Sequence, residues 1–122
     1  MAERNEKLLD FAASSFSSVW ALEMLLLLKR EPRPWPQPEL VQVLRASELV
    51  VSNACLSLLA AGLVSVDETG AAYRPASAEL STTIDQLVAL YSARPNAVRR
   101  AIIASASGGA TAFADAFKLR KD

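Results

Sequence analysis

Apolar positions recur at helical spacing along most of the chain, and short alternating stretches occur in the middle. The spacing predicts a first helix over residues 3–13. Residues 18–30 are apolar nearly all round, so we expect the second helix to lie inside, packed by other helices on most sides. A serine before it, within residues 14–18, is a suitable N-cap.

A proline-rich connector precedes the centre of the chain. Residues 31–38 (EPRPWPQP) carry proline at every second position, which predicts a stiff, extended link anchored in the core by Trp35. A short helix then starts near Gln37 or Pro38. Arg45 and Ala46 make the turn after it, and Ser47 caps the next helix.

The helix that begins after Ser47 has one predicted buried side. Val51, Ala54, Cys55 and Leu58 fall at positions i, i+3, i+4 and i+7, the spacing of a core stripe. This stripe predicts that Cys55 is a small buried hydrophobic residue and not a redox sensor.

Strands and further helices follow. Gly62 is expected to end the helix as a C′ residue with positive φ. Residues 63–66 and 71–74 are predicted to be strands of a hairpin whose turn is residues 67–70. Two further helices are predicted over residues 78–92 and 95–104. The tail after them carries Phe113 and Phe117, spaced at i and i+4.

The chain is long enough for one domain with a modest core. We predict a mainly α fold with a small two-stranded β-hairpin in a single domain over residues 1–104. Its core is residues 18–75, its flanking helices are residues 3–13 and 78–104, and residues 105–122 are a linker and C-terminal tail. Hydrophobic residues make up 52% of the chain and the formal net charge is zero.

The residue types exclude several kinds of chemistry. The chain has no histidine and a single cysteine, so a His/Cys metal site, a Ser-His-Asp triad and an internal disulfide cannot be assembled. Glu23 interrupts the apolar run of the second helix and has no second acid beside it, so we expect it to face solvent or to pair with an arginine. We predict no enzymatic activity and no cofactor.

Two segments bear on localisation, the N-terminal ten residues and the most apolar run of the chain. Residues 1–10 mix both charge signs, unlike a signal peptide. The most apolar run, residues 19–28, contains Glu23 and is shorter than the roughly 20 apolar residues that cross a bilayer. We therefore expect a cytoplasmic protein without membrane insertion.

The stretch from Pro36 to Pro75 resembles the winged helix-turn-helix regulators of the MarR and ArsR type in bacteria. The resemblance rests on the serine-capped helix, the phrase AAGLV at residues 60–64 and a hairpin that returns through Tyr73. It implies a winged helix-turn-helix with extra N- and C-terminal helices, a homodimer, and double-stranded DNA as a partner.

The same resemblance makes the helix after Ser47 the surface that reads DNA or binds a partner. Family members commonly place Arg, Lys, Gln or Thr on its outward side, because these side chains contact base edges and phosphates. Here the candidate contacts are largely apolar or small: Ser47, Glu48, Leu49, Val50, Ser52, Asn53, Leu56 and Ser57. The candidate phosphate contacts are Arg45, Arg74, Arg99 and Arg100.

The distribution of charged residues argues against DNA binding by this helix and hairpin. Residues 35–75 carry a net charge of −2, with two carboxylates at the hairpin tip, and residues after Pro75 carry +2. Neutralisation of phosphates by Lys and Arg supplies most non-specific affinity for DNA.

Two functions therefore stay open. The first is a DNA-binding transcriptional regulator that acts as a homodimer. The second is a winged-helix module that binds another protein through the apolar side of the helix, unless that side is buried against the chain's own terminal helices. A small-molecule effector is unidentified; Trp20, Trp35 and Tyr91 are candidate pocket residues, and core packing is their alternative role.

Overall fold

The computed structural model describes residues 2–105 of the chain, with side chains from Arg4 onward. In this part the chain is mainly helical and has one small antiparallel sheet, which confirms that much of the predicted fold class. Its elements are α1 (Ala2–Ser15), α2 (Val19–Arg30), α3 (Gln37–Leu44), α4 (Glu48–Ala60), β1 (Val64–Asp67), β2 (Gly70–Tyr73) and α5 (Ala78–Ala93), followed by a helix over residues 95–105. Phe113 and Phe117 lie outside the described residues.

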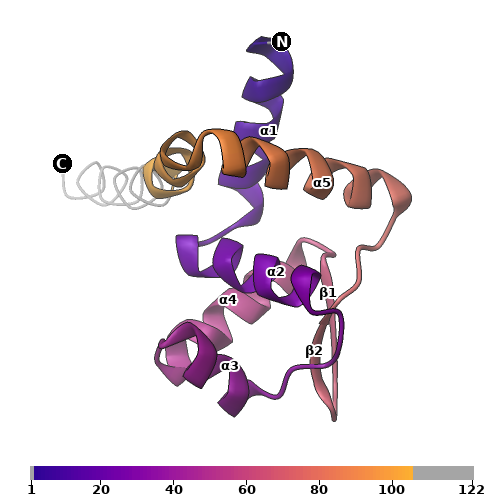
Figure 1. Cartoon of the computed structure of the whole chain (residues 1–122). Coiled ribbons are helices and arrows are strands. Elements are labelled where there is room, and N and C mark those ends of the chain that lie inside the picture. The colour runs from indigo at the N-terminus through magenta and orange to yellow at the C-terminus, as the bar shows by residue number, and fades with distance from the viewer. Residues whose placement is uncertain (1, 106–122) are drawn as a thin grey trace, which may run out of the picture.

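Helix α2 lies at the centre of the molecule (Figure 1). Its N-cap is Ser18, whose Oγ accepts a hydrogen bond from the backbone N–H of Ala21 at 3.3 Å, as expected for a serine in this position. The helix contacts α3, α4 and β2, so it is enclosed on most sides as predicted. Its buried residues are Ala21, Leu22, Met24, Leu25, Leu27 and Leu28.

The flanking helices cover one side of this centre. Helices α1 and α5 contact each other, and Figure 1 shows α5 running across α1 above α2. Lys29 of α2 forms a salt bridge with Asp85 of α5, with 3.0 Å between Nζ and Oδ1. The core residues of this layer are Leu8, Ala12, Ile84, Leu87, Leu90, Val98 and Ile102.

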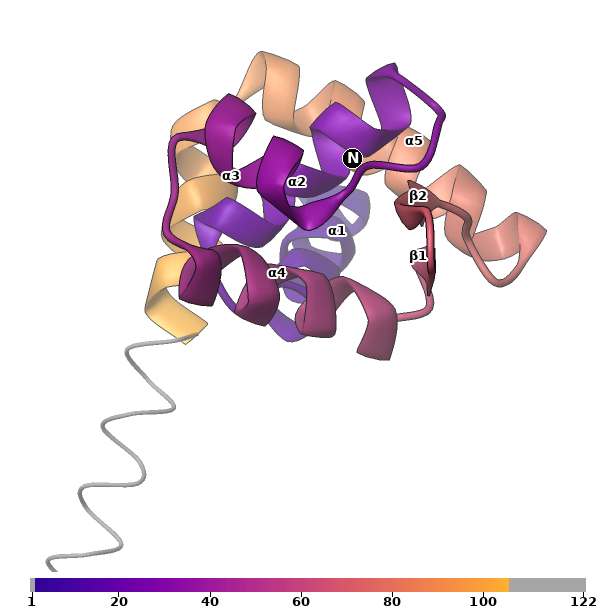
Figure 2. The ribbon, with the colours of Figure 1, turned by 90° about the horizontal axis from the view of Figure 1, so that it is seen from below.

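Helices α3 and α4 and the hairpin lie on the opposite side, nearest the viewer in Figure 2. The chain turns by 109° between α3 and α4 within three residues. Arg45 takes the left-handed conformation there, with φ of 54°, and its backbone N–H donates to the carbonyl of Val41. The axes of the two helices are therefore nearly perpendicular, and one side of α4 lies at the surface.

The hairpin has the pairing that the predicted strands imply, with Val66 opposite Ala71, but both strands lie one residue closer to the turn than predicted. Asp67 pairs with Gly70 as the last pair of the strands, and Glu68 and Thr69 are the two central residues of the turn. The Asp67 carboxylate accepts hydrogen bonds from the backbone N–H and the hydroxyl of Thr69, which stabilises the tight turn. The predicted turn residues 67–70 are therefore confirmed, and Asp67 and Gly70 also belong to the strand ends.

Trp35 joins the hairpin to the proline-rich connector. Its backbone N–H donates to the carbonyl of Ala71 at 2.8 Å, and the Ala71 N–H donates back at 3.0 Å. The Trp35 side chain is buried, as predicted. Gly70, with φ of +128°, permits this contact, because a Cβ there would lie 2.3 Å from the Trp35 carbonyl oxygen.

No single helix among residues 2–105 combines the length and the apolar composition that a bilayer crossing requires.

Candidate functional site

Helix α4 is held in place by a cap and a buried side. The Ser47 Oγ accepts a hydrogen bond from the Val50 N–H at 3.1 Å, which confirms the predicted cap. Val51, Ala54 and Leu58 are buried against the core, in agreement with the predicted stripe. Three of the four stripe positions thus orient the helix and fix which side remains outward.

The outward side of α4 is apolar and open to solvent. Leu49 is 69% exposed and Leu56 is 63% exposed, and Asn53 and Ala60 between and beyond them are exposed too. The candidate residues Ser47 and Glu48 are exposed, whereas Val50, Ser52 and Ser57 are half-buried. Burial of Leu49 and Leu56 against the chain's own helices does not occur among the described residues.

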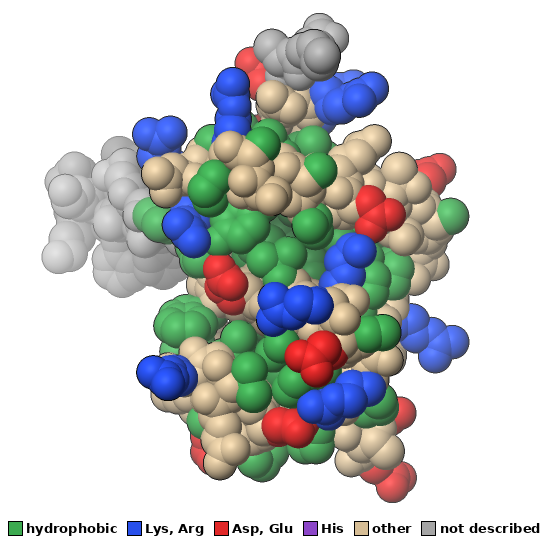
Figure 3. All heavy atoms as spheres, in the orientation of Figure 1, with side chains coloured by type: hydrophobic (Ala, Val, Ile, Leu, Met, Phe, Trp, Pro, Cys, Tyr) green, Lys and Arg blue, Asp and Glu red, His purple; other side chains and the backbone are tan. Residues whose placement is uncertain are grey.

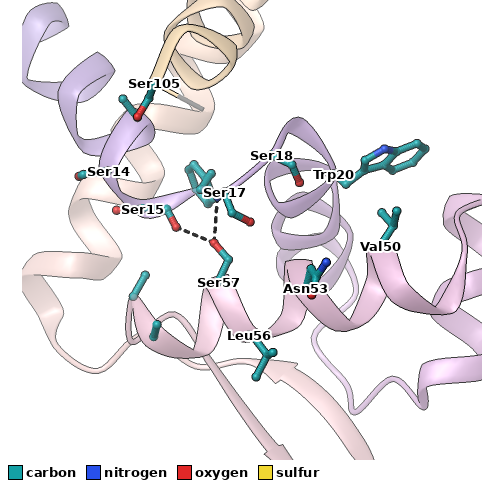
Figure 4. A pocket seen from close by; sticks show the side chains of 14 residues that line it. Ser14, Ser15, Ser17, Ser18, Trp20, Val50, Asn53, Leu56, Ser57 and Ser105 are labelled. Carbon is teal, nitrogen blue, oxygen red and sulfur yellow. Dashed lines mark hydrogen bonds between the residues drawn. The ribbon is translucent and has the colours of Figure 1, made fainter. Parts of the chain in front are cut away.

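Ser57 serves the fold. Its hydroxyl donates a hydrogen bond to the Ser15 carbonyl at 2.9 Å and accepts one from the Ser17 N–H at 3.0 Å (Figure 4). These contacts tie α4 to the link between α1 and α2. The Ser57 hydroxyl is therefore occupied within the chain, although sequence reasoning placed it among contacts to a partner.

A cleft of about 790 Å³ lies between that link and α4. Its walls include Phe16, Trp20, Asn53 and Leu56, and serine side chains from the link line its other side (Figure 4). Trp20 is 40% exposed and lines this cleft, so of the two roles considered for it, pocket lining fits its position and core packing does not. The large indole lies at the start of α2, where the link leaves it without cover.

A second groove of about 490 Å³ lies between α4, the start of α3 and the hairpin. We call it the hairpin groove. Leu56 lines both the cleft and this groove, so it forms the ridge between them. The main apolar lining residues of the hairpin groove are Trp35, Pro38, Leu56, Leu59 and Val66, and its acidic rim is Asp67 and Glu68.

Cys55 corrects the predicted core stripe. It is half-buried and lines the hairpin groove. Its position on α4 turns the thiol toward the hairpin, where α4 is only partly covered. Burial raises the pKa of the Cys55 thiol, so the unreactive protonated form is favoured at neutral pH.

Two exposed apolar residues of this surface were missed by sequence reasoning. Leu59 is 45% exposed and Val66 is 49% exposed, and both line the hairpin groove. A signal for Leu59 was present in the sequence. Leu59 follows Leu56 at i+3, the spacing of residues on one side of a helix. Val66 lies on the same side of its strand as the buried Val64, so alternation along the strand did not mark it as exposed.

The arginines predicted to contact phosphate are spread over the molecule. Arg45, Arg74 and Arg100 are exposed. The Arg99 Nε donates a hydrogen bond to the Tyr91 hydroxyl at 3.1 Å, and that hydroxyl donates to Glu23 Oε1 at 2.8 Å. Glu23 is half-buried and pairs with a tyrosine hydroxyl, so it is linked to Arg99 through Tyr91 and not by the predicted direct pair.

Charge around α4 is negative. Residues 46–73 contain no Lys or Arg, and Glu48, Asp67 and Glu68 are all exposed. The two hydrogen bonds from Thr69 lower the pKa of the Asp67 carboxyl, which keeps it ionised. Figure 3 shows acidic side chains at the end of the molecule where the hairpin lies, and mixed charges elsewhere on that face.

Among residues 2–105, no cluster of three or more His, Cys, Asp or Glu side chains is arranged to hold a metal ion. The arrangement around α4 instead offers an apolar ridge flanked by two concave surfaces, one of them rimmed by carboxylates.

Comparisons with known proteins give no relative: no protein-family model, curated protein or solved structure matches this chain.

Proposed function

We propose that this chain is a winged helix-turn-helix protein that binds another protein through the exposed side of α4. The order of elements supports the winged-helix part. Helix α2, the bridge at Trp35, helices α3 and α4 and the hairpin follow one another as that fold requires. The 109° change of direction over a three-residue turn lies within the range of helix-turn-helix units.

The observation that carries the protein-binding part is the exposure of Leu49 and Leu56 on a helix whose one charged residue is Glu48. Apolar side chains that lie together in water mark contact surfaces for other proteins. An exposed helical side with anchors at i and i+7 fits the mode in which a helix docks in an apolar groove.

DNA-binding proteins need a basic contact surface, whereas the surface of α4 is apolar and bordered by carboxylates. A specific contact with a duplex commonly neutralises on the order of six to ten phosphates with Lys and Arg. The surface formed by α4 and the hairpin has none of these residues between Ala46 and Tyr73 and three exposed carboxylates. Protein binding is therefore the function that this surface supports best.

The test is capture of a partner from the native host by the chain of 122 residues. Wild-type protein is expected to retain a specific partner, and Leu56→Glu is expected to lose it, because a carboxylate would be desolvated at the contact. Ile103→Glu is a matched control, since Ile103 is 54% exposed on the helix over residues 95–105 and lines neither the cleft nor the hairpin groove.

Thermal melts of both variants complete the design. An unchanged melt with loss of the partner supports the proposal. Retention of the partner by Leu56→Glu contradicts it.

A second candidate is a DNA-binding transcriptional regulator that acts as a homodimer. It is supported by the angle between α3 and α4, and by Asn53, an exposed amide in the middle of α4 able to pair with adenine. Arg45 stands exposed at the turn before the helix. Binding to random duplex DNA at low and moderate salt separates the candidates: a steep salt dependence supports the regulator, and no binding at low salt excludes it.

A further inference from the structure

The hairpin groove has a specific chemistry. Its lining is apolar, with Leu56, Leu59 and Val66 among its walls, and its rim carries the Asp67 and Glu68 carboxylates. A suitable occupant is therefore a segment with large apolar anchors next to basic side chains. This requirement follows from charge complementarity at the rim and from burial of apolar area in the groove.

The chain carries such a segment outside the described residues. Phe113 and Phe117 are spaced by four, so a helical conformation would place both rings on one side. Lys118, Arg120 and Lys121 follow directly, and between Phe117 and Lys121 no acidic residue opposes them.

The described chain ends at Ser105, beside the cleft that borders the hairpin groove at Leu56. Ser105 lines the cleft on one side of α4, and Leu56 separates that cleft from the hairpin groove. The eight residues from Ser105 to Phe113 span at most about 26–29 Å when extended. An α-helix with its side chains is about 10–12 Å across, so the extended segment is longer than the width of α4.

We propose that residues 113–121 dock in the hairpin groove of their own chain, with Phe113 and Phe117 in the apolar part and the basic residues beside Asp67 and Glu68. This inference rests on the proposed function, because the tail would cover the same side of α4 that the partner binds. Docking makes the tail an intramolecular competitor, and a partner has to displace it to reach Leu56.

Cys55 provides a direct reporter. It is the single cysteine of the chain and it lines the hairpin groove, so alkylation by iodoacetamide reports how often the groove is uncovered. In the full chain, the double substitution Phe113→Ser/Phe117→Ser is expected to raise the alkylation rate by about threefold or more at constant pH. The reason is that a covered thiol reacts only from the undocked fraction.

Charge is tested in the same assay. Asp67→Asn with Glu68→Gln is expected to raise the rate in the chain that keeps both phenylalanines. The same change is expected to have a much smaller effect in the Phe113→Ser/Phe117→Ser chain, where no tail remains to be released. Any direct effect of the two carboxylates on the reaction rate of the thiol is present in both chains, so the difference between the chains reports the tail alone. Ile103→Ser is the control for a changed exposed apolar residue, and it should leave the rate unaltered.

Three outcomes overturn the proposal. Equal rates in wild type and Phe113→Ser/Phe117→Ser show that the tail does not cover the groove. A rate in wild type that falls with increasing protein concentration, and becomes equal to that of the variant on dilution, assigns the groove to a second copy of the chain. Loss of the cooperative melt in the variant shows that the phenylalanines are part of the core.

Failure of this inference is distinguishable from failure of the proposed function. Unchanged Cys55 rates with a partner that still depends on Leu56 overturn the tail contact alone. A tail-dependent Cys55 rate, with partner capture indifferent to Leu56→Glu, overturns the proposed function and keeps the tail contact.

Discussion

Helices α2 and α4 consist mainly of apolar residues, yet their surroundings differ. Helix α2 buries six of its 12 residues, whereas α4 buries three of its 13. The difference lies in the neighbours: α2 is enclosed by α3, α4 and β2 with the flanking helices beyond, while the outer side of α4 has no covering element among residues 2–105. Apolar composition alone does not determine burial, and the uncovered leucines of α4 remain available for binding.

The largest expected difference between the two helices is in stability. Leu25→Ala in α2 should lower the free energy of unfolding by about 2–5 kcal/mol, because it leaves a cavity in a fully enclosed site. Leu56→Ala in α4 should change it by no more than about 0.5 kcal/mol, as expected for an exposed position. Urea unfolding of both variants measures these changes in the free energy of unfolding. A large destabilisation by Leu56→Ala would show that Leu56 is part of the core and would contradict the contrast drawn between α2 and α4.

A smaller effect is expected at Ser57, where α4 is tied to the link between α1 and α2. Ser57→Ala removes both hydrogen bonds to the link between α1 and α2, and should lower the free energy of unfolding by about 1–2 kcal/mol. Ser52→Ala is the control in the same helix, since no hydrogen bond of its side chain is seen in the described structure. Hydrogen exchange of the amides in the link should accelerate in Ser57→Ala and stay constant in Ser52→Ala.

The smallest expected change in stability comes from loss of the hydrogen bond between the Tyr91 hydroxyl and Glu23 of α2. Burial and, after it, the hydrogen bond to Glu23 raise the pKa of Tyr91 above its ordinary value of 10.0. The folded state therefore holds the Tyr91 proton more tightly than the unfolded state. Its contribution to stability is complete below pH 10 and is lost as the pH rises beyond that value.

Tyr91→Phe should consequently lower stability by about 0.5–1.5 kcal/mol at neutral pH. It should also flatten the alkaline decline of stability. The half-buried Tyr73 still produces part of this decline, because partial burial raises its pKa too. Unfolding curves at neutral and alkaline pH measure both effects. An equal alkaline decline in wild type and variant would show that Tyr91 does not titrate with unfolding.

Features governed by near neighbours in the sequence were predictable. The serine caps at Ser18 and Ser47 and the positive φ of Gly62, +74°, follow from residue chemistry within one turn of the chain. The extents of the flanking helices were also close, with residues 78–92 expected and Ala78–Ala93 observed. Here local rules are sufficient because the relevant partner is a few residues away.

Features governed by distant neighbours were not predictable in the same way. Cys55 and Trp20 both belong to apolar runs, and only the placement of the hairpin and of the α1–α2 link decides that they line open surfaces. The bridge between Trp35 and Ala71 joins residues far apart in the chain and leaves no periodic signal. The candidate surface was thus predicted as a helix side, while its two concave flanks required the tertiary arrangement.

The bridge at Trp35 also sets how the hairpin groove behaves. Since the start of α3 and the hairpin are joined through a backbone hydrogen-bonded pair, the two walls are expected to move as one unit. A preformed site of this kind loses little conformational entropy when it is filled, so most of the ordering on association falls to the incoming segment. Selectivity at this groove should then depend chiefly on how readily a segment adopts the bound shape.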